Sequence, residues 1–260
     1  MIDLPKAKKA FAQYVQSYDT KDERIALKIK HTYEVMNYSR MIAEELHLSD
    51  EQIQLASLIG LLHDIGRFEQ VRRYHTFIDR DSVDHAQLGI EILKEQNRIR
   101  LFVEQGYDDI IFDAISNHNR FQIEEGLSQE AFLQASIIRD ADKTDILRVN
   151  NENSCEVLFM CQEKEMCQTT ISDTVKKEFL QHHTILASLR QTPGDVLCSH
   201  IALVYDFHYA TGLRIIKKQQ WIQAMLHRFT FLLPKTRQDI QQIEHEVTRY
   251  LDDRLANISK

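Results

Sequence analysis

The apolar segment LASLIGLLHDIG constrains the fold of this chain more than any other feature. Ser49, followed three residues later by Gln52, predicts a capping box at which a helix begins just before this segment. Apolar residues occupy nearly every side of that helix, so we expect it to be buried. The chain must then fold as helices around it, with the polar pair His63-Asp64 in its last turn and Gly66 closing it.

The composition favours an all-α fold. The chain contains only 7 glycines and 3 prolines, so tight turns and helix breakers are few. No segment alternates polar and apolar residues for long enough to predict a sheet. Helical periodicity predicts further helices over residues 5–18, 24–46, 107–118 and 128–149, and one beginning at Asp81 or Ser82.

Two segments depart from this helical pattern. Residues 67–80 lose the helical period and mix aromatic residues with arginines, which predicts a loop over a site. A break is expected at Thr192-Pro193-Gly194 in the C-terminal part. With 260 residues the chain can bury a full core, and we expect a helical core over residues 1–150 with residues 151–260 as additional helices of the same globule.

The charge balance limits the class of ligand. The chain has 32 basic and 39 acidic residues and a net charge of -7, so it lacks the broad basic field expected of a nucleic-acid-binding protein. We therefore expect a small anionic ligand, held locally by a metal and a few cations, and no nucleic-acid partner.

Cysteine spacing and hydropathy indicate the compartment. The four cysteines match no CxxC zinc pattern, so we expect reduced thiols. Neither a signal peptide nor a membrane span is apparent, so we expect a soluble, cytoplasmic protein that does not associate with membranes. These cysteines are Cys155, Cys161, Cys167 and Cys198.

An aromatic stripe near the C-terminus is expected to pack inside the protein, with a homodimer contact as the alternative; it comprises Phe207, Tyr209 and Trp221.

His63-Asp64 is the most informative candidate for a functional site. Imidazole and carboxylate together suit a divalent metal ion, and one helix end cannot supply all the ligands that such an ion needs. Taken alone, a buried histidine is more often a hydrogen-bonded core residue. The metal interpretation is favoured because four further candidate ligands lie on expected helices: His31, His85, His118 and Asp142.

These residues occur in the order H…HD…H…H…D, within the local sequences LLHDIGRF, DHAQLG, ISNHN and RDADKTD. Over roughly residues 25–150 the chain resembles the HD-domain superfamily of metal-dependent phosphohydrolases. The resemblance implies metal ligands at His31, His63, Asp64 and Asp142, with Asp142 preferred over Asp140 because it precedes Lys143. It further implies that His85 and His118 hold a second metal ion or grip a phosphate.

Hydrolysis of a phosphate bond also requires cations near the phosphate oxygens. Arg67 and Lys143 are best placed in the sequence, so together with Asp64 they are the expected catalytic residues. For the two cations, an ordinary solvated residue at a helix end or surface is the competing interpretation. Glu69 and Asp81 are weaker candidates for a general acid, because charged residues are common in loops.

The expected function is that of a phosphohydrolase acting on a small phosphorylated molecule, with a nucleotide as the expected substrate. One or two divalent ions are the expected cofactor, and the ligand set accepts Mn, Fe, Ni, Zn, Co or Mg. A regulatory sensor that binds a nucleotide or metal without hydrolysis is the alternative. In the superfamily that the chain resembles, enzymes that cleave cyclic dinucleotides typically carry a GYP element after the HD region, and this chain has none. Guanosine-alarmone hydrolases carry a Glu-Asp pair just after the HD segment, whereas here Glu69 is followed by Gln70. Both substrate classes are therefore disfavoured.

Overall fold

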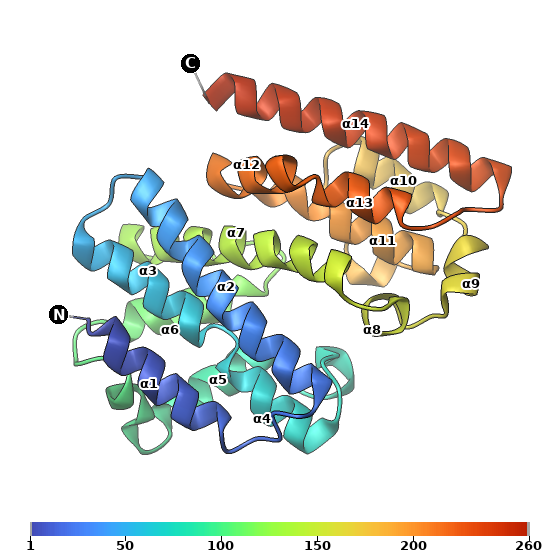
Figure 1. The fold of residues 1–260 in the computed structure, drawn as a ribbon. Helices are drawn as coiled ribbons and strands as arrows, with labels where there is room; N and C mark the ends of the chain where they lie inside the picture. Colours follow the sequence, from blue (N-terminus) through green and yellow to red (C-terminus); the bar gives the residue numbers. More distant parts are fainter. Residues whose placement is uncertain (1, 259–260) are drawn as a thin grey trace. The chain divides into compact units, whose positions relative to one another are not determined.

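The computed structural model describes residues 2–258 and confirms the all-α fold. Every regular element among these residues is an α-helix, labelled α, or a short 3-10 helix, labelled η (Figure 1). The chain divides between Asp142 and Lys143 into two compact units, so the division falls before residue 150, where the core was expected to end. None of the described helices combines the length and the apolar character needed to cross a membrane.

The N-terminal unit surrounds a buried central helix, α3. The capping box predicted at Ser49 and Gln52 is present, and α3 packs against α1, α2 and α6. Its side chains at Leu55, Leu58 and Ile59 are fully buried. The helices of this unit are α1 (Leu4–Val15), α2 (Glu23–Glu45), α3 (Asp50–Leu62), α4 (Ile65–Tyr74), α5 (His85–Lys94) and α6 (Asp108–His118), with the 3-10 helices η1 (Asp79–Asp81) and η2 (Glu95–Leu101) and the first part of α7 (Gln129–Glu152).

Helix α4 corrects the prediction that residues 67–80 form a loop, and Gly66 does not close the preceding helix. Gly66 lies within the first turn of α4, where a Cβ atom would stand 2.2 Å from the carbonyl oxygen of His85 and 2.6 Å from the backbone nitrogen of Gly89. The glycine therefore serves the close packing of α4 on α5, which sequence alone does not distinguish from a helix stop.

The beginning of α5 also differs from the expectation. The helix starts at His85, where the Asp84 side chain accepts hydrogen bonds from the backbone nitrogens of Ala86 and Gln87. Asp81 instead ends the short 3-10 helix η1. Residues 75–84 therefore form a connecting segment between α4 and α5, shorter than the loop that was predicted.

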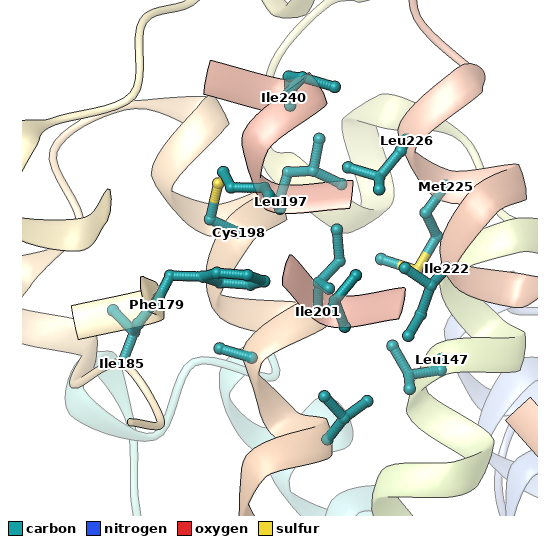
Figure 2. Close-up of a cluster of buried hydrophobic side chains, with 14 of the residues drawn as sticks. Leu147, Phe179, Ile185, Leu197, Cys198, Ile201, Ile222, Met225, Leu226 and Ile240 are labelled. Atoms are coloured by element: carbon teal, nitrogen blue, oxygen red, sulfur yellow. The ribbon is translucent and has the colours of Figure 1, made fainter. Parts of the chain in front are cut away.

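The C-terminal unit is also helical and has its own apolar core. Figure 2 shows Leu197, Ile201, Ile222 and Met225 among the buried side chains that face one another there. Long α14 lies along α10, α12 and α13 (Figure 1). The helices are α8 (Cys155–Phe159), α9 (Glu163–Cys167), α10 (Asp173–Leu180), α11 (Pro193–Ile201), α12 (Ala210–Gln219), α13 (Trp221–His227) and α14 (Pro234–Ile258), with η3 (Ala187–Leu189) and η4 (Ala202–Asp206).

Two sequence predictions fall in this unit. The break at Thr192-Pro193-Gly194 is confirmed as a helix boundary, because Thr192 caps α11 in a capping box with Asp195. In the aromatic stripe, Phe207 is buried in the core and Trp221 packs against it. All four cysteines are free thiols.

Candidate metal centre

The candidate ligands are brought together where α3 gives way to α4. His63 directly follows the last residue of α3, and Asp64 directly precedes the first residue of α4. The two side chains therefore lie at a junction between helices rather than in a regular last turn, and adjacent residues can face one point there. The other ligands come from separate helices: His31 from α2, His85 from α5, His118 from α6 and Asp142 from α7.

One group of ligand atoms surrounds the Oδ2 atom of Asp64. This oxygen lies 3.4 Å from Nε2 of His31 and 3.5 Å from Nε2 of His63, and the two nitrogens are 3.3 Å apart. Oδ1 of Asp142 approaches the same nitrogens, at 3.1 Å from His31 and 3.8 Å from His63. The four ligands implied by the resemblance therefore do converge.

A second group lies on the other oxygen of the same carboxylate. Oδ1 of Asp64 is 3.4 Å from Nε2 of His85 and 3.8 Å from Nε2 of His118, and these nitrogens are 3.0 Å apart. Asp64 thus presents one oxygen to each pair of histidines. Such a carboxylate can bridge two ions, or serve one ion while the second pair of histidines binds a ligand.

Hydrogen bonds on the far side of three imidazole rings fix their orientation. Nδ1 of His63 donates to the carbonyl oxygen of Gly60 at 2.8 Å, and Nδ1 of His118 donates to that of Ile115 at 2.7 Å. Nδ1 of His85 lies 2.6 Å from Oδ2 of Asp79. A ring that donates from Nδ1 keeps the lone pair of Nε2 for a metal ion, which is the usual arrangement in metalloproteins.

The spacing of the nitrogens tests whether an ion fits. Two imidazole nitrogens bound about 2.1 Å from one ion, at tetrahedral or octahedral angles, lie about 3.0–3.4 Å apart. The pairs His31–His63 and His85–His118 are 3.3 and 3.0 Å apart. In the pair His85–His118 both rings donate from Nδ1, so neither Nε2 can donate to the other while the rings are neutral, and an ion or ligand between them accounts for their spacing.

Burial and charge set the protonation states that metal binding requires. Burial lowers the pKa of His63, and burial together with Arg67 lowers the pKa of His85 to about 4. Burial alone would raise the pKa of the Asp64 carboxyl, but Lys28 and His63 outweigh it and hold that pKa well below its ordinary value. At neutral pH these imidazoles are neutral and this carboxylate is ionised, as metal ligands must be.

The metal-free protein is expected to lose stability as the pH falls from about 6.5 to about 4. The folded-state pKa of His85 is depressed to about 4, so the unfolded chain binds more protons in this window and the free energy of unfolding rises with pH. His85 alone is expected to contribute a loss of about 1 kcal/mol between pH 7.5 and 5.5. Urea unfolding with a chelator present, at several pH values, measures this slope; His85→Asn should make it shallower, and an unchanged slope would contradict the assignment.

The two cations predicted to be catalytic occupy different surroundings. Nη1 of Arg67 donates to the carbonyl oxygen of Phe77 and the carboxylate of Asp79, both within 2.8 Å, and Nε lies 3.6 Å from Oδ1 of Asp64. The Arg67 side chain therefore lies beside the candidate metal ligand Asp64. Nζ of Lys143 forms an ion pair with Asp206 at 2.8 Å in the C-terminal unit, and its catalytic role stays a prediction.

Two residues at the site were missed in the sequence. Nζ of Lys28 lies 2.7 Å from Oδ2 of Asp64. A signal existed, because Lys28 precedes His31 by one turn of the same helix and so shares its face. Asp79, which orients His85, lies between α4 and α5, where no periodicity points to it. The weaker candidates are paired elsewhere, Glu69 with Arg72 and Arg73 and Asp81 with Arg80.

Comparisons with known proteins agree with this geometry. Residues 29–147 match the family model of the HD domain, a range that contains all six candidate metal ligands. Ribonuclease Y from two strains of Staphylococcus epidermidis is 33% identical over 92 residues, which cover 35% of this chain and 14% of the relatives. No solved structure is significantly similar to the chain. Residues 29–147 are therefore an HD domain.

Proposed function

We propose that this chain is a metal-dependent phosphohydrolase acting on a small phosphorylated molecule, with a nucleotide as the expected substrate. HD domains are mostly metal-dependent hydrolases, which supports this reaction class. The observation that carries the proposal is the arrangement around Asp64, whose two oxygens each face a pair of histidine Nε2 atoms. The ligand chemistry therefore fits one or two divalent ions.

Each side chain has a defined part in this proposal. His31, His63, Asp64 and Asp142 would hold the first ion, while His85 and His118 would hold a second ion or grip a phosphate. A divalent ion bound there supplies Lewis acidity and lowers the pKa of water at the site. Asp79 keeps His85 in the tautomer that leaves its Nε2 lone pair available.

Arg67 is proposed to bind a phosphate oxygen. Its side chain is fixed through Nη1, which donates to Gln70, Phe77 and Asp79. Its buried Nε has no hydrogen-bond acceptor within the described residues and faces Asp64. A fixed guanidinium with a donor still available suits recognition of a phosphoryl group next to the metal ligands.

The net charge of the chain favours a small substrate over a nucleic acid. Acidic residues outnumber basic ones by 39 to 32, so the chain lacks the electrostatic attraction that usually carries nucleic-acid binding. The similarity to Ribonuclease Y covers 14% of that protein and favours RNA as the rival substrate. The other rival is a sensor that binds a nucleotide and does not hydrolyse it.

The proposal is tested by elemental analysis of the purified chain, followed by assays of phosphate release. A panel of nucleotides, simple phosphomonoesters and a short RNA should be incubated with added Mn, Co, Ni, Zn or Mg. We expect stoichiometric metal and turnover of a small substrate that stops with a chelator and returns with metal. Turnover of RNA and of no small substrate would contradict the proposal and indicate a nuclease. Bound metal without any turnover would favour the sensor.

A further inference from the structure

We infer that Lys28 binds the phosphate of the substrate and that, together with Arg67, it makes the site select a terminal, doubly negative phosphoryl group over a phosphodiester. The inference rests on the proposed function, because it names the substrate class of the same site. It starts from the ion pair between Nζ of Lys28 and Oδ2 of Asp64, at 2.7 Å.

The position of Lys28 places its ammonium group at the first group of ligands. Oδ2 of Asp64 is the oxygen that also faces His31 and His63. An ion held by those residues would draw on the same oxygen and would place a second positive charge close to the ammonium group. An anion that contacts both relieves this repulsion, so a phosphate oxygen is the natural partner of Lys28 in the loaded site.

Lys28 lies on the side of the cluster that solvent reaches. The four histidine side chains and that of Asp64 are at most 4% exposed. In contrast, the side chains of Lys28, Arg67 and Asp142 are each 15% exposed. A ligand that enters from solvent can therefore contact Lys28, Arg67 and Asp142 before it reaches the histidines.

An aromatic ring supports both cations. Nζ of Lys28 lies 5.4 Å from the centre of the Phe77 ring, and the guanidinium carbon of Arg67 lies 5.7 Å from it. The ring is held in place because the carbonyl oxygen of Phe77 accepts a hydrogen bond from Arg67, and that of His75 accepts one from Arg24. The ring face attracts cations, so it helps to hold both groups beside Asp64.

Two cations beside the candidate metal ligands imply that the site prefers a phosphate group with more negative charge. A terminal phosphoryl group carries close to two negative charges at neutral pH, whereas a phosphodiester carries one and has substituents on two of its oxygens. Lys28 and Arg67 can each bind a free oxygen of the terminal group. A diester has only two free oxygens, so if an ion takes one of them a single oxygen is left for the two cations, whereas a terminal group still offers one to each.

The test measures binding and does not depend on turnover. Isothermal titration of the metal-loaded chain with inorganic phosphate, and separately with dimethyl phosphate, should show tighter binding of inorganic phosphate. In Lys28→Met the affinity for inorganic phosphate is expected to fall about 10-fold or more, the usual effect of removing a charge-assisted hydrogen bond. The metal content should not change, and the affinity for dimethyl phosphate should change little. Lys28→Arg should recover most of the loss.

The matched control is Lys9→Met, which removes one positive charge from an exposed position of α1 and should leave both affinities unchanged. Unchanged phosphate affinity in Lys28→Met would overturn the inference, as would equal affinity of the unaltered chain for the two phosphates. Loss of metal in Lys28→Met would also overturn it, because Lys28 would then only support Asp64. If the chain hydrolyses a substrate but Lys28→Met binds phosphate as before, the inference fails and the proposed function stands. If phosphate binds as expected but no substrate is hydrolysed, the proposed function fails and the inference on binding stands.

Discussion

Asp64→Asn is expected to abolish metal binding and hydrolysis while the chain stays folded. Asp64 contributes an oxygen to both pairs of histidines, so a single substitution weakens both groups of ligands at once. The amide has nearly the shape of the carboxylate and still accepts a hydrogen bond from Lys28, but it carries no charge to offset an ion. Residues that merely orient a ligand change metal affinity by about 10- to 100-fold, so loss of this ligand should reduce activity by more than about 100-fold.

Metal content, turnover and thermal unfolding should be measured on the same preparation. Asp50→Asn is the matched control, because Asp50 is an exposed residue in the first turn of α3 and should leave metal and activity unchanged. Full metal content and activity in Asp64→Asn would contradict the proposal that this carboxylate is a metal ligand. Unfolding of the variant at ordinary temperature would show that the pair with Lys28 is chiefly structural.

Gly66→Ala is expected to destabilise the N-terminal unit by about 1–2 kcal/mol. The new methyl group would meet the carbonyl oxygen of His85 at 2.2 Å and the nitrogen of Gly89 at 2.6 Å, both backbone atoms that cannot rotate away. Overpacking of this kind costs about 1–3 kcal/mol and sometimes more, which outweighs the gain of about 1 kcal/mol from replacing glycine by alanine in a helix. The two helices must separate, and His85 at the start of α5 moves with its backbone.

The substitution should therefore weaken metal binding as well as stability. Urea unfolding and metal titration of Gly66→Ala measure the two effects, and Gln87→Ala provides a control at an exposed position of α5. A variant with the stability of the unaltered chain would mean that α4 and α5 can move apart at little cost.

The convergence of the ligands could be predicted from the sequence because few residue types bind metals. His31, His63, Asp64 and Asp142 stood on expected helices, and in the structure Nε2 of each of the two histidines lies within 3.8 Å of an oxygen of each aspartate. The shared role of Asp64 could not be predicted, because it depends on the turn of the chain between α3 and α4.

Helix α4 was mistaken for a loop because its buried side is partly polar. Phe68 and Val71 are buried as periodicity requires, but Glu69 and Gln70 are buried too. Besides nearby arginines, each has a partner farther along the chain: Glu69 accepts from Tyr18, and Gln70 donates to Asp79. A hydrophobic pattern cannot reveal polar residues that tertiary contacts satisfy.

The hydrogen bonds from Nδ1 of His63 and His118 to backbone carbonyl oxygens have a consequence for metal supply. Because both rings are held by their own helices, we expect these two imidazoles to keep their orientation with or without an ion, so that loading requires little reordering of them. A prearranged set of imidazole and carboxylate ligands accepts several first-row ions, with affinities that rise along the series from manganese to copper. Which ion the protein carries is then decided by the free concentrations of metals around it, and the metal found after purification should change with the growth medium.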